Sequence, residues 1–294
     1  FPELPVLESA PVLQVLVIDG PTGASPLELL KSELARVFKG GWFTSRILRS
    51  GSLIPDPFRG TQGGGYTFEA LIGVAANAKK APDKYGFEIK TYQGAKLSLM
   101  TPTPDGGYQG THPFREFMSR FGHPGKSGDG SLRFTGVHRC GVENKNTQMF
   151  LRVAGFDEAT GKYHENPSQI AVQLVHRPSD EIVASWSLAH LANAWNSKHS
   201  SAAYVPSTKR TAPLGSQHDA EYSYGPSVIV GQGTDVWKLL NAIRSSEIYY
   251  DPADSIYSDG KAKVRPQWRI NTRQLKKTLT PLYNSVEMYQ LADC

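Results

Sequence analysis

The sequence has few cysteines and no long apolar run. Cys140 and Cys294 are its only cysteines, and neither lies in a metal-ligand spacing, so a disulfide framework and a cysteine zinc site are excluded. No apolar stretch approaches the roughly 18 residues that a membrane-spanning helix needs. The N-terminal segment lacks the positive and apolar regions of a signal peptide. We therefore expect a protein of the cytoplasm with no membrane partner.

Acidic residues are missing from one basic segment near the C-terminus. Residues 261–286 contain seven Lys or Arg and no Asp or Glu, in a chain of net charge +5. A second basic segment, residues 36–59, has a single acidic residue, Asp56. Aromatic residues such as Trp42 and Trp268 lie within both segments. This pattern is typical of a surface that follows nucleic-acid phosphates, although a charged face exposed to solvent gives the same pattern.

The length of 294 residues allows one large domain or two smaller ones. Because the chain starts at Phe1 and not at Met, we expect that it is trimmed or is one domain of something longer. Periodicity predicts a mixed α/β domain with a central sheet. Strands are expected at 12–18, 83–90, 96–104, 147–157, 169–177, 181–186, 201–210, 248–250 and 267–270, and helices at 187–199 and 235–246. Residues 105–147, rich in Gly, His, Arg and Pro, are expected to form long loops.

Two helices are expected near the N-terminus. Ser25 is a good N-cap, Pro26 suits the first helical position, and Glu28 completes a capping box for a helix that ends at Gly40. A second helix is predicted over residues 67–78. The stretch before it, "GTQGGGY", is expected to be a mobile loop, because three successive glycines resist ordering.

The stretch "APDKYGFEIKTY", residues 81–92, carries the chemistry. Strand periodicity places Glu88 and Lys90 on one face, with Phe87 and Ile89 packing on the other. Asp83 lies at the strand entry, where a bend could direct its carboxylate toward Glu88. Two carboxylates and one carbonyl oxygen suit Mg²⁺, and a lysine beside them can orient water and offset the charge of a phosphate. An Asp followed by Glu-x-Lys also occurs by chance on surface strands.

These residues resemble the MvaI/BcnI-type restriction endonucleases, which are related to the mismatch-repair nicking enzyme MutH. The likeness covers "GGWFTSR" (40–46), "YTFEALIG" (66–73), the segment just described and "LSLMTPTP" (97–104). It continues more weakly at "ASWSLAHLANAWNSKHSSAAYV" (184–205) and "WRINTRQL" (268–275). The resemblance implies the PD-(D/E)xK fold, a central mixed sheet flanked by helices, with catalytic and recognition lobes around a DNA cleft.

The resemblance also implies an active site and a reaction. Asp83 and Glu88 would hold Mg²⁺ together with the carbonyl of Ile89, Lys90 would position the attacking water, and Glu69 would support the metal or its water shell. The implied reaction is hydrolysis of double-stranded DNA to 5′-phosphate and 3′-hydroxyl ends by a monomer.

One departure concerns recognition. The family usually carries a His-Asp-His-Gly stretch before its closing Phe-Arg, whereas this chain reads "GKAKVRPQW" there, with no histidine. We therefore do not transfer the CC-W-GG or CC-S-GG specificity. The expected division is an N-terminal extension or linker (1–24), a catalytic core with inserted loops (25–210) and a C-terminal DNA-contacting region (211–294).

Arg265, Gln267 and Arg269 alternate along a predicted strand and could reach base edges or phosphates, which would turn Trp268 toward the core. The full set of expected DNA-contacting residues is Arg46, Arg49, Lys263, Arg265, Gln267 and Arg269. The histidines show no metal spacing, and His112, His123 and His138 are expected to be polar loop residues. Lys198 and His199 are expected to end a helix, where a positive charge is favourable, and not to belong to a site.

The sequence is compatible with three functions. The first is a site-specific Mg²⁺-dependent restriction endonuclease. The second is the same nuclease as the loosely specific effector domain of a larger anti-phage defence protein. The third is a DNA-binding module without catalysis.

Overall fold

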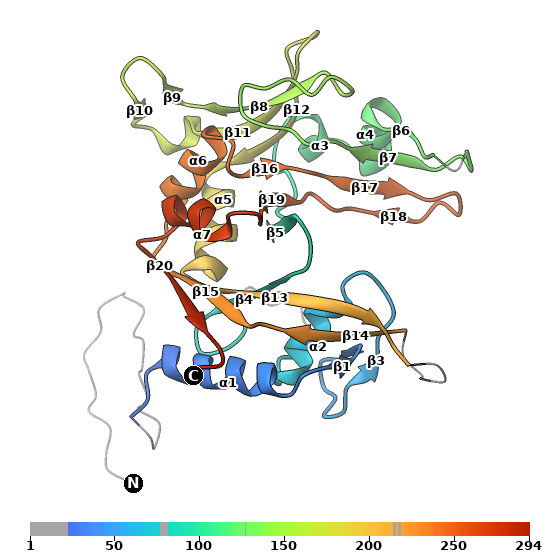
Figure 1. The fold of residues 1–294 in the computed structure, drawn as a ribbon. Coiled ribbons are helices and arrows are strands. Elements are labelled where there is room, and N and C mark those ends of the chain that lie inside the picture. The colour runs from blue at the N-terminus through green and yellow to red at the C-terminus, as the bar shows by residue number, and fades with distance from the viewer. Residues whose placement is uncertain (1–22, 77–81, 127, 214–215, 217–218) are drawn as a thin grey trace, which may run out of the picture.

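The computed structural model describes residues 23–76, 82–126, 128–213, 216 and 219–294. The strand expected at 12–18 lies outside them, as does nearly all of the expected extension 1–24. The chain is α/β, as predicted, and Figure 1 shows two parts stacked on each other. One contains α1, α2, β13 and β14, and the other contains α3, α4, α6, β8 and β17. Within the described ranges, none of the helices has the length and apolar character that crossing a bilayer requires.

A mixed sheet forms the centre of the first part. Its strands run in the order β1-β14-β13-β15-β20, and β4 also pairs with β13. The β4–β13 pair is parallel and the other pairs are antiparallel. The strands are β1 (Phe43–Thr44), β4 (Glu88–Tyr92), β13 (Ser201–Thr211), β14 (Ala220–Tyr224), β15 (Ser227–Gln232) and β20 (Ser285–Gln290). The expected central mixed sheet is confirmed.

Helices cover both faces of this sheet, and successive side chains along each strand point alternately to the two faces. Ala203 and Val205 of β13 pack in a core with α1 (Pro26–Lys39) and α2 (Gly63–Leu71). Ala202 and Tyr204 point into a larger core with α5 (Leu188–His199) and α6 (Val236–Arg244). Strand β13 therefore joins the two parts through side chains on its two faces.

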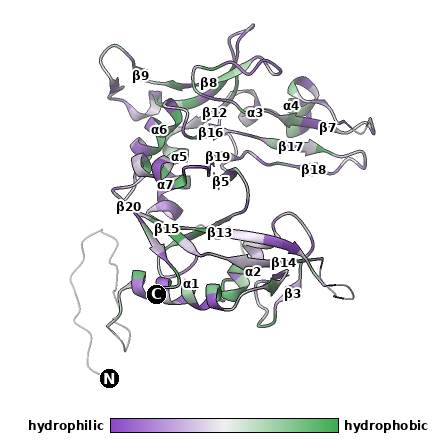
Figure 2. Cartoon of the chain, in the orientation of Figure 1, coloured by the Kyte–Doolittle hydropathy of each residue, from purple (hydrophilic) through white to green (hydrophobic). Residues whose placement is uncertain are grey.

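Helix α1 forms as predicted. The amide of Glu28 donates to Ser25 Oγ, and the amide of Ser25 donates to Glu28 Oε2, which is the reciprocal capping box. Leu30, Leu34 and Val37 are buried against the sheet. Figure 2 shows the resulting alternation of green and purple segments along α1.

Helix α2 corrects the prediction of a mobile loop. Gly63, Gly64 and Gly65 form its first turn, and the helix ends at Leu71, before the expected residue 78. Gly63 is required by close approach, because a Cβ at this position would lie 2.5 Å from the Tyr222 hydroxyl oxygen. The sequence pattern shows glycine's flexibility but not the neighbour that excludes a side chain.

The second part holds the remaining elements, and the strands and helices predicted at 147–157, 169–177, 181–186, 187–199 and 235–246 are confirmed. The strands are β5 (Lys96–Met100), β6 (His123–Pro124), β7 (Leu132–Thr135), β8 (Met149–Ala154), β9 (Phe156–Asp157), β10 (Lys162–Tyr163), β11 (Ala171–His176), β12 (Glu181–Ser187), β16 (Tyr249–Tyr250), β17 (Ala253–Ile256), β18 (Ala262–Lys263) and β19 (Trp268–Asn271). The helices are α3 (Gly107–Thr111), α4 (Phe114–Phe121), α7 (Leu275–Leu279), η1 (Pro167–Gln169) and η2 (Thr280–Leu282). Strands β2 (Arg46–Ile47) and β3 (Asp56–Pro57) form a separate hairpin, which lies beside α2 in the first part (Figure 1).

Residues 105–147 are more ordered than predicted. They contain α3, α4, β6 and β7. Phe117, Met118 and Phe134 are buried in the larger core, with Phe117 and Phe134 in an edge-to-face contact. These few apolar anchors organise a segment whose glycines and prolines suggest loops. His138, expected as a polar loop residue, is fully buried, and burial lowers its pKa to about 4.

The division at residue 210 stays a prediction. Strands β14, β15 and β20 follow that position and belong to the central sheet together with β4 and β13. The same C-terminal segment also supplies α6, β17, β18 and β19 to the second part.

Candidate active site

A cleft of about 1330 Å³ lies between the two parts of the molecule. Residues from α2, β4, β5, α5 and β19, and from the segments before β4 and β19, line it. The charged and amide residues among them are Arg49, Gln62, Glu69, Asp83, Lys84, Glu88, Lys90, Gln93, Lys96, Lys198, Arg265, Gln267 and Arg269. The fold thus gathers residues from both predicted functional segments around one space.

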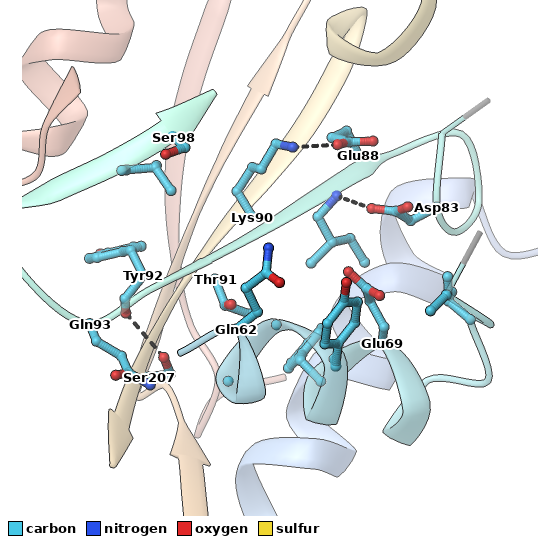
Figure 3. A pocket seen from close by; sticks show the side chains of 18 of the residues that line it. Gln62, Glu69, Asp83, Glu88, Lys90, Thr91, Tyr92, Gln93, Ser98 and Ser207 are labelled. Atoms are coloured by element: carbon cyan, nitrogen blue, oxygen red, sulfur yellow. Dashed lines mark hydrogen bonds and ion pairs between the residues drawn. The ribbon is translucent and has the colours of Figure 1, made fainter. Parts of the chain in front are cut away.

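A tight turn brings Asp83 to the start of β4, as the sequence predicts. Tyr85 and Gly86 have positive φ angles of 51° and 80°, and the turn is closed by the Asp83 amide, which donates to the carbonyl of Phe87 at 3.0 Å. The amide of Ile89 then donates to Asp83 Oδ2 at 2.8 Å. Figure 3 shows the Asp83 carboxylate beside the strand that carries Glu88 and Lys90.

Glu88 is the buried centre of the site. Its side chain is 3% exposed, and Lys90 Nζ lies 2.5 Å from its Oε1 atom. Its Oε2 atom receives no hydrogen bond from the described residues. Phe87 and Ile89 point to the opposite side, into the core with α1 and α2, so the predicted division of faces is confirmed.

Glu69 and Asp83 complete a group of crowded carboxylates. Glu69 extends from α2 into the same space, as Figure 3 shows. Burial, followed by the charge of Asp83, raises the pKa of Glu69 to about 7. Burial, followed by the charge of Glu88, also raises the pKa of Asp83. Further negative charge is therefore disfavoured in this group, and a cation bound there would offset it.

This donor set fits a divalent cation held partly by water. Within the described ranges, no three His, Cys, Asp or Glu side chains lie close enough to enclose an ion by themselves. Mg²⁺ usually binds through one or two carboxylates and keeps several waters, so a closed cage is not required. A buried carboxylate oxygen on Glu88, which receives no hydrogen bond from the described residues and lies next to Asp83, is the kind of group that such an ion would satisfy.

Lys198 belongs to the site, which corrects its assignment as only a helix terminus. It lies in the last turn of α5, as expected, but its Nζ atom is 3.5 Å from Glu88 Oε2. It lines the cleft together with Lys90. The parallel pairing of β4 with β13, the strand that follows α5, brings Lys198 to Glu88.

The expected DNA-contacting residues fall into two groups. Arg49, Arg265, Gln267 and Arg269 line the cleft, whereas Arg46 and Lys263 are not among its lining residues. The Arg46 guanidinium is bonded to Thr44, at its carbonyl oxygen and its Oγ1.

The cleft-lining arginines differ in how they are held. Arg269 donates to Asp251 Oδ2 and to Ser98 Oγ, both at 3.0 Å, so its guanidinium is anchored. The backbone amide of Arg265 donates to Asp254 Oδ1 at 2.5 Å, which leaves the side chain to face the cleft. Trp268 is fully buried, as the strand alternation predicts, and packs edge-to-face on Trp186.

A mixed sheet whose parallel strand carries this carboxylate and lysine set beside a cleft is the arrangement of a PD-(D/E)xK-type nuclease. The profile of the MvaI/BcnI restriction endonuclease family matches residues 31–279, and the chain belongs to this family. It is therefore a DNA endonuclease of the restriction type, and the predicted resemblance is confirmed.

One comparison with a solved structure supports the fold. The complex of the restriction endonuclease MvaI with its cognate DNA has a TM-score of 0.65 and 21% sequence identity, over 91% of this chain and 99% of that one. MvaI in the absence of DNA matches with a TM-score of 0.42 and 19% identity, over 90% and 98% of the two chains. No functionally curated protein matches the chain.

Proposed function

We propose that the chain is a site-specific, Mg²⁺-dependent endodeoxyribonuclease that hydrolyses double-stranded DNA to 5′-phosphate and 3′-hydroxyl ends. The observation that supports this proposal is the buried Glu88, whose Oε2 atom has no hydrogen bond from the described residues and only the ammonium of Lys198 at 3.5 Å, while Asp83 and Lys90 lie beside it. A buried acidic group with an unsatisfied oxygen is costly unless a ligand uses it. Restriction enzymes need such a group for a cation.

Asp83 and Glu88 would hold Mg²⁺, and the backbone of Ile89 would add a third oxygen. The N–H of Ile89 points to Asp83 Oδ2. In an extended strand the N–H and C=O of one residue face the same edge, so the Ile89 carbonyl is expected on the side of Asp83. When bound, Mg²⁺ supplies Lewis-acid polarisation of the phosphate and a lowered pKa for water.

Lys90 would orient the attacking water and offset the charge that develops on the phosphate. It is already fixed by its contact with Glu88 Oε1, and its side chain is 22% exposed, so the ammonium reaches the cleft. Glu69 would support the metal's water shell. With a pKa of about 7, Glu69 can also take up a proton near neutral pH.

The duplex would lie in the cleft between the two parts. MvaI was solved with its cognate DNA, and its similar fold supports double-stranded DNA as the partner of this chain. Arg49, Arg265 and Gln267 line the wall, and an arginine or glutamine there suits phosphates or the edges of guanine and adenine. We further propose that the chain acts as a monomer in anti-phage restriction. The free Cys140 and Cys294 agree with a reducing cytoplasm.

Digestion of plasmid and phage DNA tests the proposal. Wild type with Mg²⁺ should give discrete fragments, and these should vanish with EDTA or in Glu88→Ala. End-labelling should then find 5′-phosphates. A smear would favour the loosely specific effector, and a gel shift without cleavage would favour the binding module.

A further inference from the structure

Lys198 lies between the cleft and a second, smaller hollow. The hollow has a volume of about 390 Å³ and is bounded by α5 and by the segment from Leu99 to Thr103. Glu88, Lys90 and Lys198 line both spaces. Since Lys90 Nζ contacts Oε1 of Glu88 and Lys198 Nζ lies 3.5 Å from Oε2, each carboxylate oxygen faces its own ammonium group.

We propose that Lys198 is a positioning residue that competes with the divalent cation for Glu88 and moves toward the hollow when the cation binds. The inference rests on the proposed function, because it assumes that Glu88 is a cation ligand. A Mg²⁺ ion coordinates oxygen at about 2.0–2.1 Å. An ammonium group 3.5 Å from the same oxygen would then face a divalent charge at close range in a partly buried site, where such repulsion is strong.

The hollow offers the displaced ammonium group new acceptors. His199 Nε2 lies 3.1 Å from the carbonyl oxygen of Leu99, and since a carbonyl oxygen only accepts, Nε2 must carry the proton. Nδ1 of His199 is therefore an acceptor, and among the described residues it has no hydrogen-bond donor. His199 itself lines the hollow. The hydroxyl groups of Thr101 and Thr103 line the same space.

The other charged groups around Glu88 leave Lys198 as the mobile member. Lys90 is held at 2.5 Å on Oε1 and is 22% exposed, whereas Lys198 makes a longer contact and is 32% exposed. Asp83 and Glu69 are carboxylates and add to the attraction for a cation. Burial, together with the nearby Lys90 and Lys198, keeps the pKa of His199 low, so this ring brings no positive charge.

The alternative is that Lys198 only stabilises the C-terminal end of α5. Lys39 provides a matched control, because it occupies the last turn of α1 and bonds the carbonyl oxygen of Cys294 at 3.0 Å. Neutralising either lysine removes a helix-terminal charge, but only Lys198 contacts Glu88.

The test is Mn²⁺ binding to the DNA-free full chain, measured by calorimetry on wild type, Lys198→Met, Lys198→Arg and Lys39→Met. Removing the competing charge should tighten Mn²⁺ binding by about tenfold in Lys198→Met. Lys198→Arg and Lys39→Met should stay near wild type. Lys198→Gln serves as a second neutral variant if Lys198→Met does not fold, and thermal melting checks each protein.

An unchanged or weaker Mn²⁺ affinity in the folded neutral variants would contradict the competition, while leaving the nuclease proposal intact. Equal tightening in Lys39→Met would show a general charge effect and would also overturn the inference. A wild type that binds no Mn²⁺ would contradict both the inference and the metal dependence of the proposed function.

Discussion

The amide of Ile89 donates a hydrogen bond to Asp83 Oδ2 at 2.8 Å, and this contact fixes the Asp83 carboxylate next to Glu88. The bond serves two purposes. It satisfies one oxygen of a half-buried carboxylate that lines the cleft, and a carboxylate has a second oxygen with which it can act on a ligand there. Substitutions of Asp83 can therefore distinguish the effect of its negative charge from the effect of its hydrogen bond to Ile89.

Asp83→Asn should fold like wild type and fail to cut DNA. Its amide oxygen can still accept from Ile89, but the negative charge needed for a metal ligand is lost. Removing the charge should also relieve repulsion with Glu88, so stability should not fall. Urea unfolding and Mg²⁺-dependent cleavage would be measured on one preparation. Asp83→Ala, which loses the acceptor as well, is the control and should be less stable.

Glu69→Gln should reveal a pH-dependent cost of burying Glu69. The folded-state pKa of about 7 exceeds the ordinary 4.5. The folded state therefore binds this proton more tightly, and the free energy of unfolding decreases as pH rises from 4.5 to about 7. Glutamine cannot ionise. The free energy of unfolding of the variant should therefore exceed that of wild type by about 2 kcal/mol at about pH 8, measured without divalent cations. Urea unfolding at several pH values measures this. A stability difference that does not change with pH would contradict the pKa assignment.

Arg265→Ala should weaken DNA binding alone, whereas Arg269→Ala should also reduce stability. The Arg265 side chain faces the cleft, so its loss should weaken DNA binding and reduce the salt slope by about 1 if it contacts a phosphate. Arg269 is bonded to Asp251 and Ser98, so its loss should lower the melting temperature as well. Fluorescence anisotropy over a salt series, with melting curves alongside, separates the two. Equal losses of affinity and stability in both variants would argue against this distinction.

Gly63→Ala and Gly65→Ala should change stability in opposite directions. A Cβ on Gly63 would lie 2.5 Å from the hydroxyl oxygen of Tyr222, a largely buried ring, and should cost about 1–3 kcal/mol. A Cβ on Gly65 would meet Thr91 Oγ1 at 3.7 Å, an ordinary contact, so the alanine should add about 0.5–1 kcal/mol through helix propensity. Urea unfolding midpoints measure both. Stabilisation by both substitutions would show that close approach is not what requires Gly63.

Local signals account for what the sequence predicts correctly. The capping box at Ser25 and Glu28 and the alternation from Phe87 to Lys90 depend on neighbours within a few residues, so periodicity and capping rules find them. The turn at Asp83 likewise depends on residues close to it in the sequence. The part of the site that these segments carry was therefore predictable.

Long-range contacts account for the rest. Lys198 reaches Glu88 because β13 pairs with β4, and no local pattern shows that pairing. The order at Gly63 depends on Tyr222, which is distant in the sequence. Strands β14, β15 and β20 were missed, since their place is decided by pairing across the sheet.

The most direct test of the central claim compares cleavage with DNA binding in Glu88→Gln. Glutamine keeps the size of Glu88 and an acceptor for Lys90, but it removes the charge that a metal requires. We predict that single-turnover cleavage with Mg²⁺ falls on the order of a thousandfold, because metal catalysis contributes several kcal/mol, while DNA affinity measured without a divalent cation stays within a few-fold of wild type. Cleavage by Glu88→Gln at the wild-type rate, with the same requirement for Mg²⁺, would contradict the assignment of this site as the catalytic centre.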